Sequence, residues 1–278
     1  MSTSIGGSNL TGLGALAQRE RSLQLAMARL ASGKRITGAA DDPAGLVISQ
    51  QFAAQRAGMD QASANAENGV SMARIADGGL EQTQEILNRQ RELAIQAGNT
   101  ATMDPNQLEA LNNEFKSLGT ALDMVARNTA FGRQPLLDGS FQGKSFQIGP
   151  SATDTVQVSI GSDVTGQVRG FDSAGLGLSG IDLADAAGAL ARIDAASKAV
   201  GTQRGDLGAF QSNTLETTLR SLSVAGENLA SAESTIADTD YAQQSAEMVR
   251  NQILMQAGLA MRAQGNMNAS RALQLLGG

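Results

Sequence analysis

Apolar residues at helical spacing run through most of the chain. In residues 44–96 a small or apolar side chain recurs every seventh residue, and in residues 106–129 the spacing alternates between three and four. Such repeats predict helices that pack along their length. The link around Pro105 is short, so we expect the second helix to fold back antiparallel on the first. The two repeats consist of Phe52, Met59, Ala66, Ala73, Leu80, Leu87 and Ala94, and of Leu108, Leu111, Phe115, Leu118, Leu122 and Val125.

A third repeat occupies residues 181–236, and its register slips once. Leu207 and Leu215 are eight residues apart instead of seven, and glycines cluster where the slip occurs. We expect a kink or an adjustment of helical phase there. The repeat consists of Ala186, Ile193, Val200, Leu207, Leu215, Leu222, Leu229 and Ile236, and the glycines are Gly201, Gly205 and Gly208.

Both ends of the chain also have amphipathic patterns. Residues 9–32 are predicted to form a helix that stops at Ser32-Gly33, and residues 33–43 form a turn-rich link in which Asp41 and Asp42 can cap the next helix. Residues 238–276 are predicted to form the last helix. The apolar residues expected to mediate self-assembly are Leu13, Leu16, Leu23, Met27 and Leu30 in the first helix, and Met248, Ile253, Met255 and Leu259 in the last.

The centre of the chain has a different pattern. Val156, Val158 and Ile160 alternate with polar residues, which is typical of a half-buried strand. We therefore expect a small β-hairpin region at about 140–175, with an irregular loop as the alternative. The predicted fold is mainly α: a long antiparallel coiled-coil-like helical bundle with a small central β-hairpin region and paired terminal helices. Residues 1–40 with 238–278 would form a terminal-helix domain, and residues 41–237 a helical rod with no further outer domain.

Composition argues against catalysis. The chain contains no histidine and no cysteine, so the commonest general base, thiolate nucleophiles and the commonest zinc ligands are all missing. We expect no enzyme activity, no cofactor and no metal site. The net charge of −6 argues against nucleic-acid binding, and no apolar run is long enough to insert into a membrane. The N-terminus lacks the pattern of a cleaved signal peptide.

The expected helices differ in how completely they can bury their apolar stripes. The three inner repeats can cover one another in a bundle, whereas pairing the two terminal helices leaves apolar surface exposed. Uncovered apolar surface of this kind marks an interaction site. Because both ends contribute, we expect the terminal helices to pack against copies of the same chain in a repetitive, open assembly.

Three segments resemble bacterial flagellin. They are LASGKRITGAADDPAGLVIS at 30–49, LNRQRELAIQ at 87–96, and the segment from DTDYAQQSAEMVRNQ to ALQLLGG at 238–278. The resemblance implies a subunit that polymerises into the flagellar filament for swimming motility and is exported unfolded through the flagellar type III apparatus. It also implies an export chaperone, hook-associated proteins and cap proteins as partners. The location would be the extracellular filament, the commoner case, rather than a periplasmic one.

The resemblance also implies roles for particular residues. The terminal helices would line the central channel of the filament, with Gln252, Gln256 and Gln264 as the channel-facing candidates. In relatives recognised by an innate immune receptor, the matching contact positions are Arg89, Leu93 and Glu114, although Asn88 and Gln90 depart from the commoner pattern. Arg89 and Glu114 could instead form ion pairs within the bundle or between subunits. Two alternative functions are a hook–filament junction protein and a surface homologue that binds polysaccharide.

Overall fold

The computed structural model describes residues 4–99, 101, 103–164 and 169–276. The chain divides into two compact units, the terminal unit of residues 1–56 with 227–278 and the rod unit of residues 57–226. The long helices α2 (Pro43–Ala97) and α5 (Glu216–Ala237) contribute to both. In the described part of the chain, no helix combines the length and the apolar character needed to cross a bilayer.

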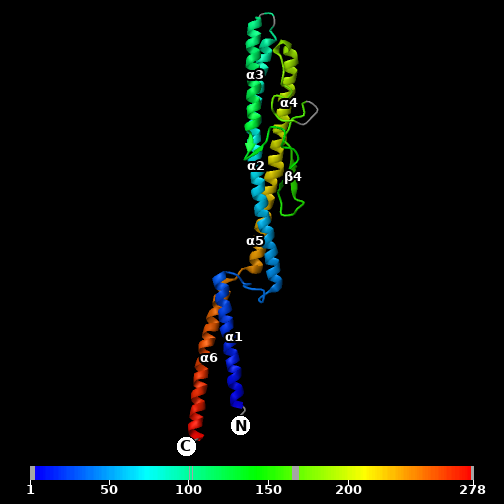
Figure 1. Ribbon diagram of the computed structural model, residues 1–278. Helices are drawn as coiled ribbons and strands as arrows, with labels where there is room; N and C mark the ends of the chain where they lie inside the picture. The colour runs from blue at the N-terminus through cyan, green and yellow to red at the C-terminus, as the bar shows by residue number, and fades with distance from the viewer. Residues whose placement is uncertain (1–3, 100, 102, 165–168, 277–278) are drawn as a thin grey trace. The chain divides into compact units, whose positions relative to one another are not determined.

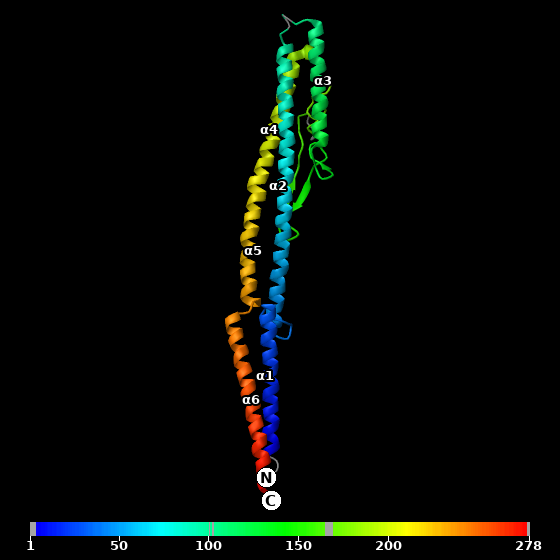
Figure 2. The same ribbon diagram turned by 90° about the vertical axis from the view of Figure 1, so that its left-hand side faces the viewer.

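The rod unit is an antiparallel bundle. Helix α3 (Pro105–Asn128) lies beside α2, and α4 (Ala186–Ala209) lies on another side of α2, as both views show (Figures 1 and 2). A capping box begins α3: the Asp104 side chain accepts from the helix backbone, and the Gln107 side chain accepts from the Asp104 backbone N–H. Polar contacts also tie α2 to α4: Arg204 Nε lies 2.6 Å from Asp77 Oδ1, and Arg91 Nη2 lies 3.4 Å from Asp194 Oδ1.

The predicted repeats form the core of the bundle. Ala66, Ala73, Leu80, Leu87 and Ala94 are all fully or almost fully buried, as are Phe115 and Leu122 of α3. The predictions of a mainly helical fold and of an antiparallel return are therefore confirmed. Helix α2 passes through Gly78-Gly79 without a break. A Cβ on Gly79 would lie 2.5 Å from Thr129 Oγ1 and 2.8 Å from Leu137 Cδ1, so this glycine lets the segment after α3 approach the helix backbone.

The one-residue slip in the third repeat coincides with a π-helical turn. Residues Phe210–Leu215 form this turn (η2) between α4 and α5, with the Glu216 N–H donating to Gln211 O. A π turn holds one more residue than an α turn. Leu207 and Leu215 are therefore both buried although they are eight residues apart. The phase adjustment that the sequence predicted exists, but it lies just after the glycine cluster.

The described part of the central segment contains two short antiparallel hairpins. Strand β1 (Ala130–Phe131) pairs with β2 (Gln134–Pro135), and β3 (Lys144–Gln147) pairs with β4 (Thr155–Val158). The predicted alternation is confirmed, because Val158 and Ile160 are buried and Gln157 and Ser159 are exposed. A short 3-10 turn, η1 (Leu183–Asp185), leads into α4.

Candidate self-assembly surface

The terminal unit pairs α1 (Ser4–Ser32) with α6 (Tyr241–Leu276). The two helices run antiparallel and side by side, so the start of α1 and the end of α6 lie at the same end of the pair (Figures 1 and 2). The structure describes the backbone of residues 4–13 but not the burial of their side chains, so the predicted residue Leu13 is not placed. The other predicted self-assembly residues can be placed individually.

The link after α1 is hydrogen-bonded to the link before α6. Gly33 ends α1 with a φ of +70°, which favours glycine. Beyond it, the Arg35 N–H donates to Ala237 O at 2.7 Å and the Thr239 N–H donates to Gly33 O at 2.9 Å. The Arg35 guanidinium also donates twice to Ile236 O, from Nε at 3.1 Å and Nη2 at 2.7 Å. These bonds hold the C-terminal end of α1 close to the N-terminal end of α6.

Aspartates order both links. Asp42 Oδ1 accepts from the Gly45 N–H and caps α2, and Asp240 Oδ1 accepts from the Ala242 N–H and caps α6. Asp41 does not cap a helix. Its Oδ2 accepts from Thr37 Oγ1 at 2.7 Å and from Thr37 N at 3.0 Å. These hydrogen bonds lower the pKa of Asp41 below its usual value, and the nearby charge of Arg29 acts in the same direction.

On α1, the predicted stripe is only partly buried. Leu23 is buried together with Ala26, Leu16 and Leu30 are half-buried, and Met27 is exposed. Gly258 of α6 faces α1, and a Cβ added there would lie 3.1 Å from Leu16 Cδ2. Gly258 therefore allows the two helices to approach closely, and sequence reasoning had assigned it no role.

On α6, apolar side chains remain exposed over most of the helix circumference. Ile253 is 59% exposed, Leu259 52% and Met261 73%, while Met248 and Met255 are half-buried. At 100° per residue, the exposed apolar residues span an arc of roughly 220°. That arc is about twice the width of an ordinary amphipathic stripe. Its members are Val249, Ile253, Leu254, Leu259, Met261 and Met267.

This arc defines the candidate self-assembly surface. Gly258, which faces α1, lies outside it, so α1 covers only the remaining side of α6. Val249, Ile253 and Leu254 line a shallow, largely apolar hollow on the helix surface. A helix with apolar residues on so many sides is normally buried by several neighbours. Among the described residues, the helix that packs along α6 is α1.

The three channel-facing candidates lie together on one side of α6. Gln252 is half-buried, and Gln256 and Gln264 are exposed. At 100° per residue the three fall within roughly 120° of one another. They share that sector with Val249 and Ile253, so this side of the helix mixes amide and apolar groups.

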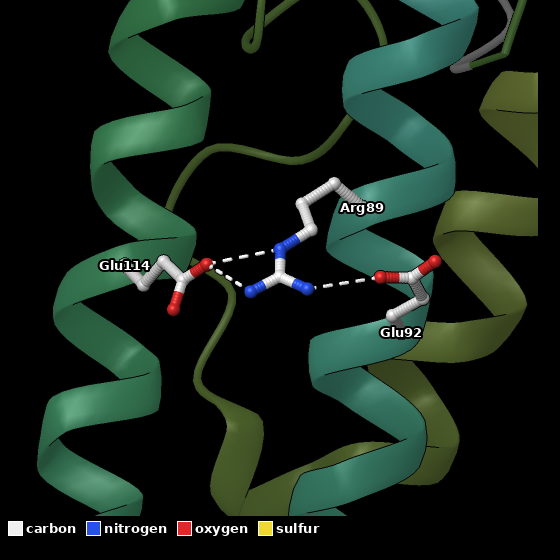
Figure 3. A network of polar contacts seen from close by, with 3 residues as sticks. All are labelled: Arg89, Glu92 and Glu114. Carbon is white, nitrogen blue, oxygen red and sulfur yellow. Dashed lines mark hydrogen bonds and ion pairs between the residues drawn. The ribbon is translucent and has the colours of Figure 1, made fainter.

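The receptor-contact candidates lie in the rod unit, where Arg89 joins two helices. Arg89 donates to Glu114 Oε1 of α3 from Nε at 3.0 Å and Nη2 at 2.6 Å, and from Nη1 to Glu92 Oε2 at 3.0 Å (Figure 3). The hydrogen bonds to Glu114, followed by the one to Glu92, raise the pKa of Arg89. The alternative of an ion pair within the bundle is therefore observed. Arg89 and Glu114 are exposed, whereas Leu93 is buried in the core.

Comparison with known proteins agrees with this architecture. Residues 8–142 match the bacterial flagellin N-terminal helical region, and residues 190–276 match the bacterial flagellin C-terminal helical region. Flagellin of Bacillus subtilis (strain 168) is 37% identical over 295 residues, covering 96% of this chain and 97% of that protein. The flagellar filament 31.3 kDa core protein of Treponema maltophilum is 37% identical, covering 90% and 91%.

A solved structure, that of Bacillus cereus flagellin, is 24% identical and has a TM-score of 0.48, covering 61% of this chain and 94% of that one. The two terminal regions and the similarity along almost the whole length place both ends of this chain and its rod in one family. The chain belongs to the bacterial flagellin family.

Proposed function

We propose that this protein is the structural subunit that polymerises into the bacterial flagellar filament for swimming motility. The observation that carries the proposal is the 220° arc of exposed apolar side chains on α6, defined above. Burying a large apolar side chain completely is worth roughly 1.5–3 kcal/mol. Association costs on the order of 4–15 kcal/mol, so no single contact suffices. An arc of this width faces more than one direction, so more than one neighbouring copy can cover it, as in an open helical polymer.

The terminal-helix domain of residues 1–40 and 238–278 forms the filament core in this proposal, and the rod of residues 41–237 forms its outer surface. Gln252, Gln256 and Gln264 face the central channel, because an uncharged polar wall neither traps nor repels an unfolded chain in transit. Changing Gln256 and Gln264 to Leu should slow filament growth. Growth at the native rate would contradict this role.

Export and location follow from the same proposal. The subunit leaves the cell unfolded through the flagellar type III apparatus, with an export chaperone, hook-associated proteins and cap proteins as partners. The filament lies outside the cell, where antibody should label it on intact cells. Labelling only after the outer envelope is opened would place it in the periplasm.

An innate immune receptor is a further partner in this proposal, contacting Arg89 and Glu114 at the rod surface. Arg89→Ala should reduce receptor activation by purified monomer. Because the change also breaks the pair with Glu114, unfolding should be measured in parallel, with Glu114→Gln as the matched variant. Undiminished activation by both variants would remove this assignment.

Seeded polymerisation tests the main proposal. Changing both Ile253 and Leu259 to Gln should abolish filaments seen by electron microscopy while leaving a folded rod. Ile95→Gln is the matched control for Ile253, because Ile95 is also 59% exposed but lies near the end of α2 in the rod unit. Native growth by the α6 variant would refute the proposal, as would equal loss in the control.

A further inference from the structure

One flank of the α1–α6 pair forms a polar groove, which adjoins the apolar hollow of α6 at Arg250. Arg19 and Arg29 of α1 and Gln244, Glu247 and Arg250 of α6 contribute to its lining. Arg19 and Arg29 are ten residues apart, so along α1 the groove extends roughly 15 Å. The arginines lie at both of its ends and on both of its walls.

The groove carries more positive than negative charge, because three arginines and one glutamate contribute to its lining. Among the described residues, Arg19, Arg29 and Arg250 form no ion pair within 4.0 Å and no side-chain hydrogen bond. Glu247 is the only carboxylate in the lining, and its Oε2 lies 3.5 Å from Gln244 Nε2. Arg29 Nε is buried without a hydrogen-bond partner, although the charge of Arg29 lowers the pKa of Asp41.

The terminal helices carry net positive charge and the rest of the chain carries net negative charge. Helices α1 and α6 together contain six arginines, two glutamates and no lysine, a net charge of +4. The whole chain has a net charge of −6, so the remainder carries −10. The acceptors that the groove lacks are therefore abundant in the rod of any second copy. Opposite charges on two surfaces favour their encounter and fix their orientation.

We infer that the groove lined by Arg19, Arg29 and Arg250 binds carboxylate side chains on the rod of a second copy. The inference rests on the proposed function and adds an electrostatic contact to it. The apolar arc of α6 supplies most of the burial, and the groove specifies which part of the neighbouring copy meets the terminal helices. Exposed ion pairs are screened by salt, so assembly should depend on ionic strength.

The critical concentration for seeded polymerisation, measured at 50 and 500 mM NaCl (about 14 and 4 Å of screening length), tests this inference. Changing Arg19, Arg29 and Arg250 together to Gln should raise it roughly eightfold at low salt, a factor of about two for each pair. The matched control changes Arg21, Arg262 and Arg271 to Gln, which removes the same charge from the same helices outside the groove. Changing the three groove residues to Lys keeps the charge and should largely restore assembly.

The outcomes separate this inference from the proposed function. Native protein should polymerise less readily at high salt, and the groove variant should lose that dependence while the control retains it. Filaments of the groove variant with native salt dependence would overturn the inference and leave the filament function intact. An equal effect in the control would overturn the inference, because the loss of assembly would then depend on net charge and not on the groove. Binding of native monomer to vesicles of anionic lipid, with salt-independent polymerisation, would assign the groove to a membrane surface instead.

Discussion

Leu16 of α1 packs against Gly258 of α6, and an added Cβ at Gly258 would lie only 3.1 Å from Leu16 Cδ2. The contact of this added Cβ would be tighter than an ordinary van der Waals approach, but the end of a leucine side chain can move. At this position, side-chain size can decide how closely the first and last helices of the chain pair. Gly258 also lies outside the exposed arc of α6, so the pair and the polymer use different sides of that helix.

Enlarging Gly258 should therefore weaken the terminal pair selectively. Gly258→Val should force the helices apart and raise the critical concentration for filament growth, while the rod keeps its unfolding midpoint. Gly265 has no neighbour within 4 Å of an added Cβ, so Gly265→Ala should be tolerated and should favour the helix by roughly 0.5–1 kcal/mol. Circular dichroism of the monomer and seeded growth provide the measurements. Equal tolerance of Gly258→Val would show that the contact does not matter.

Gln90 occupies a core position between α2 and α3 and should reduce the stability of the rod. It is fully buried, its Nε2 lies 3.4 Å from Phe115 O, and its Oε1 has no hydrogen-bond partner. Gln90→Met should raise the free energy of unfolding by roughly 1 kcal/mol, because an unsatisfied buried acceptor is removed. Leu87→Ala, one turn earlier in the same core, should lower it by about 2–5 kcal/mol. Urea unfolding followed by circular dichroism measures both, and a destabilised Gln90→Met variant would contradict the reasoning.

The π turn predicts an unusual tolerance to deletion. Removing the exposed Asn213 should convert Phe210–Leu215 to regular α-helix and leave Leu207 and Leu215 seven residues apart, both still facing the core. The expected loss of stability is about 1 kcal/mol or less, within the range of ordinary surface changes. Deleting the exposed Thr202, in regular α-helix, should instead rotate all later residues by roughly 100° and disrupt the packing. Similar thermal unfolding of the two deletion variants would contradict this account.

Asp41 should make the first link sensitive to acid. Hydrogen bonds from Thr37 hold the pKa of Asp41 below its usual value of 3.8. The folded state therefore binds the proton less readily than the unfolded chain. The resulting stabilisation is present above pH 3.8 and is lost as the pH falls through the lower pKa of the folded state.

A titration of the Thr37 amide signal by nuclear magnetic resonance should report this transition. This pH-dependent shift of the Thr37 signal should disappear in Asp41→Asn. The transition of Asp182, followed at the Ala184 amide, should persist as an internal control, because hydrogen bonds from Ala184 and Asn112 also lower the pKa of Asp182. An unchanged Thr37 titration in the variant would exclude Asp41 as its cause. With no histidine in the chain, we expect little change in stability between pH 6 and 8.

The sequence by itself determined the helical architecture. Repeats such as Leu80, Leu87 and Ala94 place one face of a helix in the core, and the alternation of Val156, Val158 and Ile160 does the same for a strand. These patterns are local, because the period of a secondary structure decides which residues share a face. The eight-residue step from Leu207 to Leu215 likewise revealed an irregularity, although not its π geometry. The absence of histidine and cysteine was enough to argue against most enzyme chemistry.

Tertiary structure decided which side chains meet. Gly258 opposes Leu16, the Arg35 guanidinium reaches Ile236 O across 201 residues, and Arg19, Arg29 and Arg250 share one groove. Leu93, a predicted receptor contact, lies in the core because its side of α2 faces the bundle. No periodicity encodes such contacts, since they depend on how the helices are rotated and shifted against one another. The apolar arc of α6 joins both levels: its residues are visible in the sequence, but only the pairing with α1 shows how much of it is left for other copies to cover.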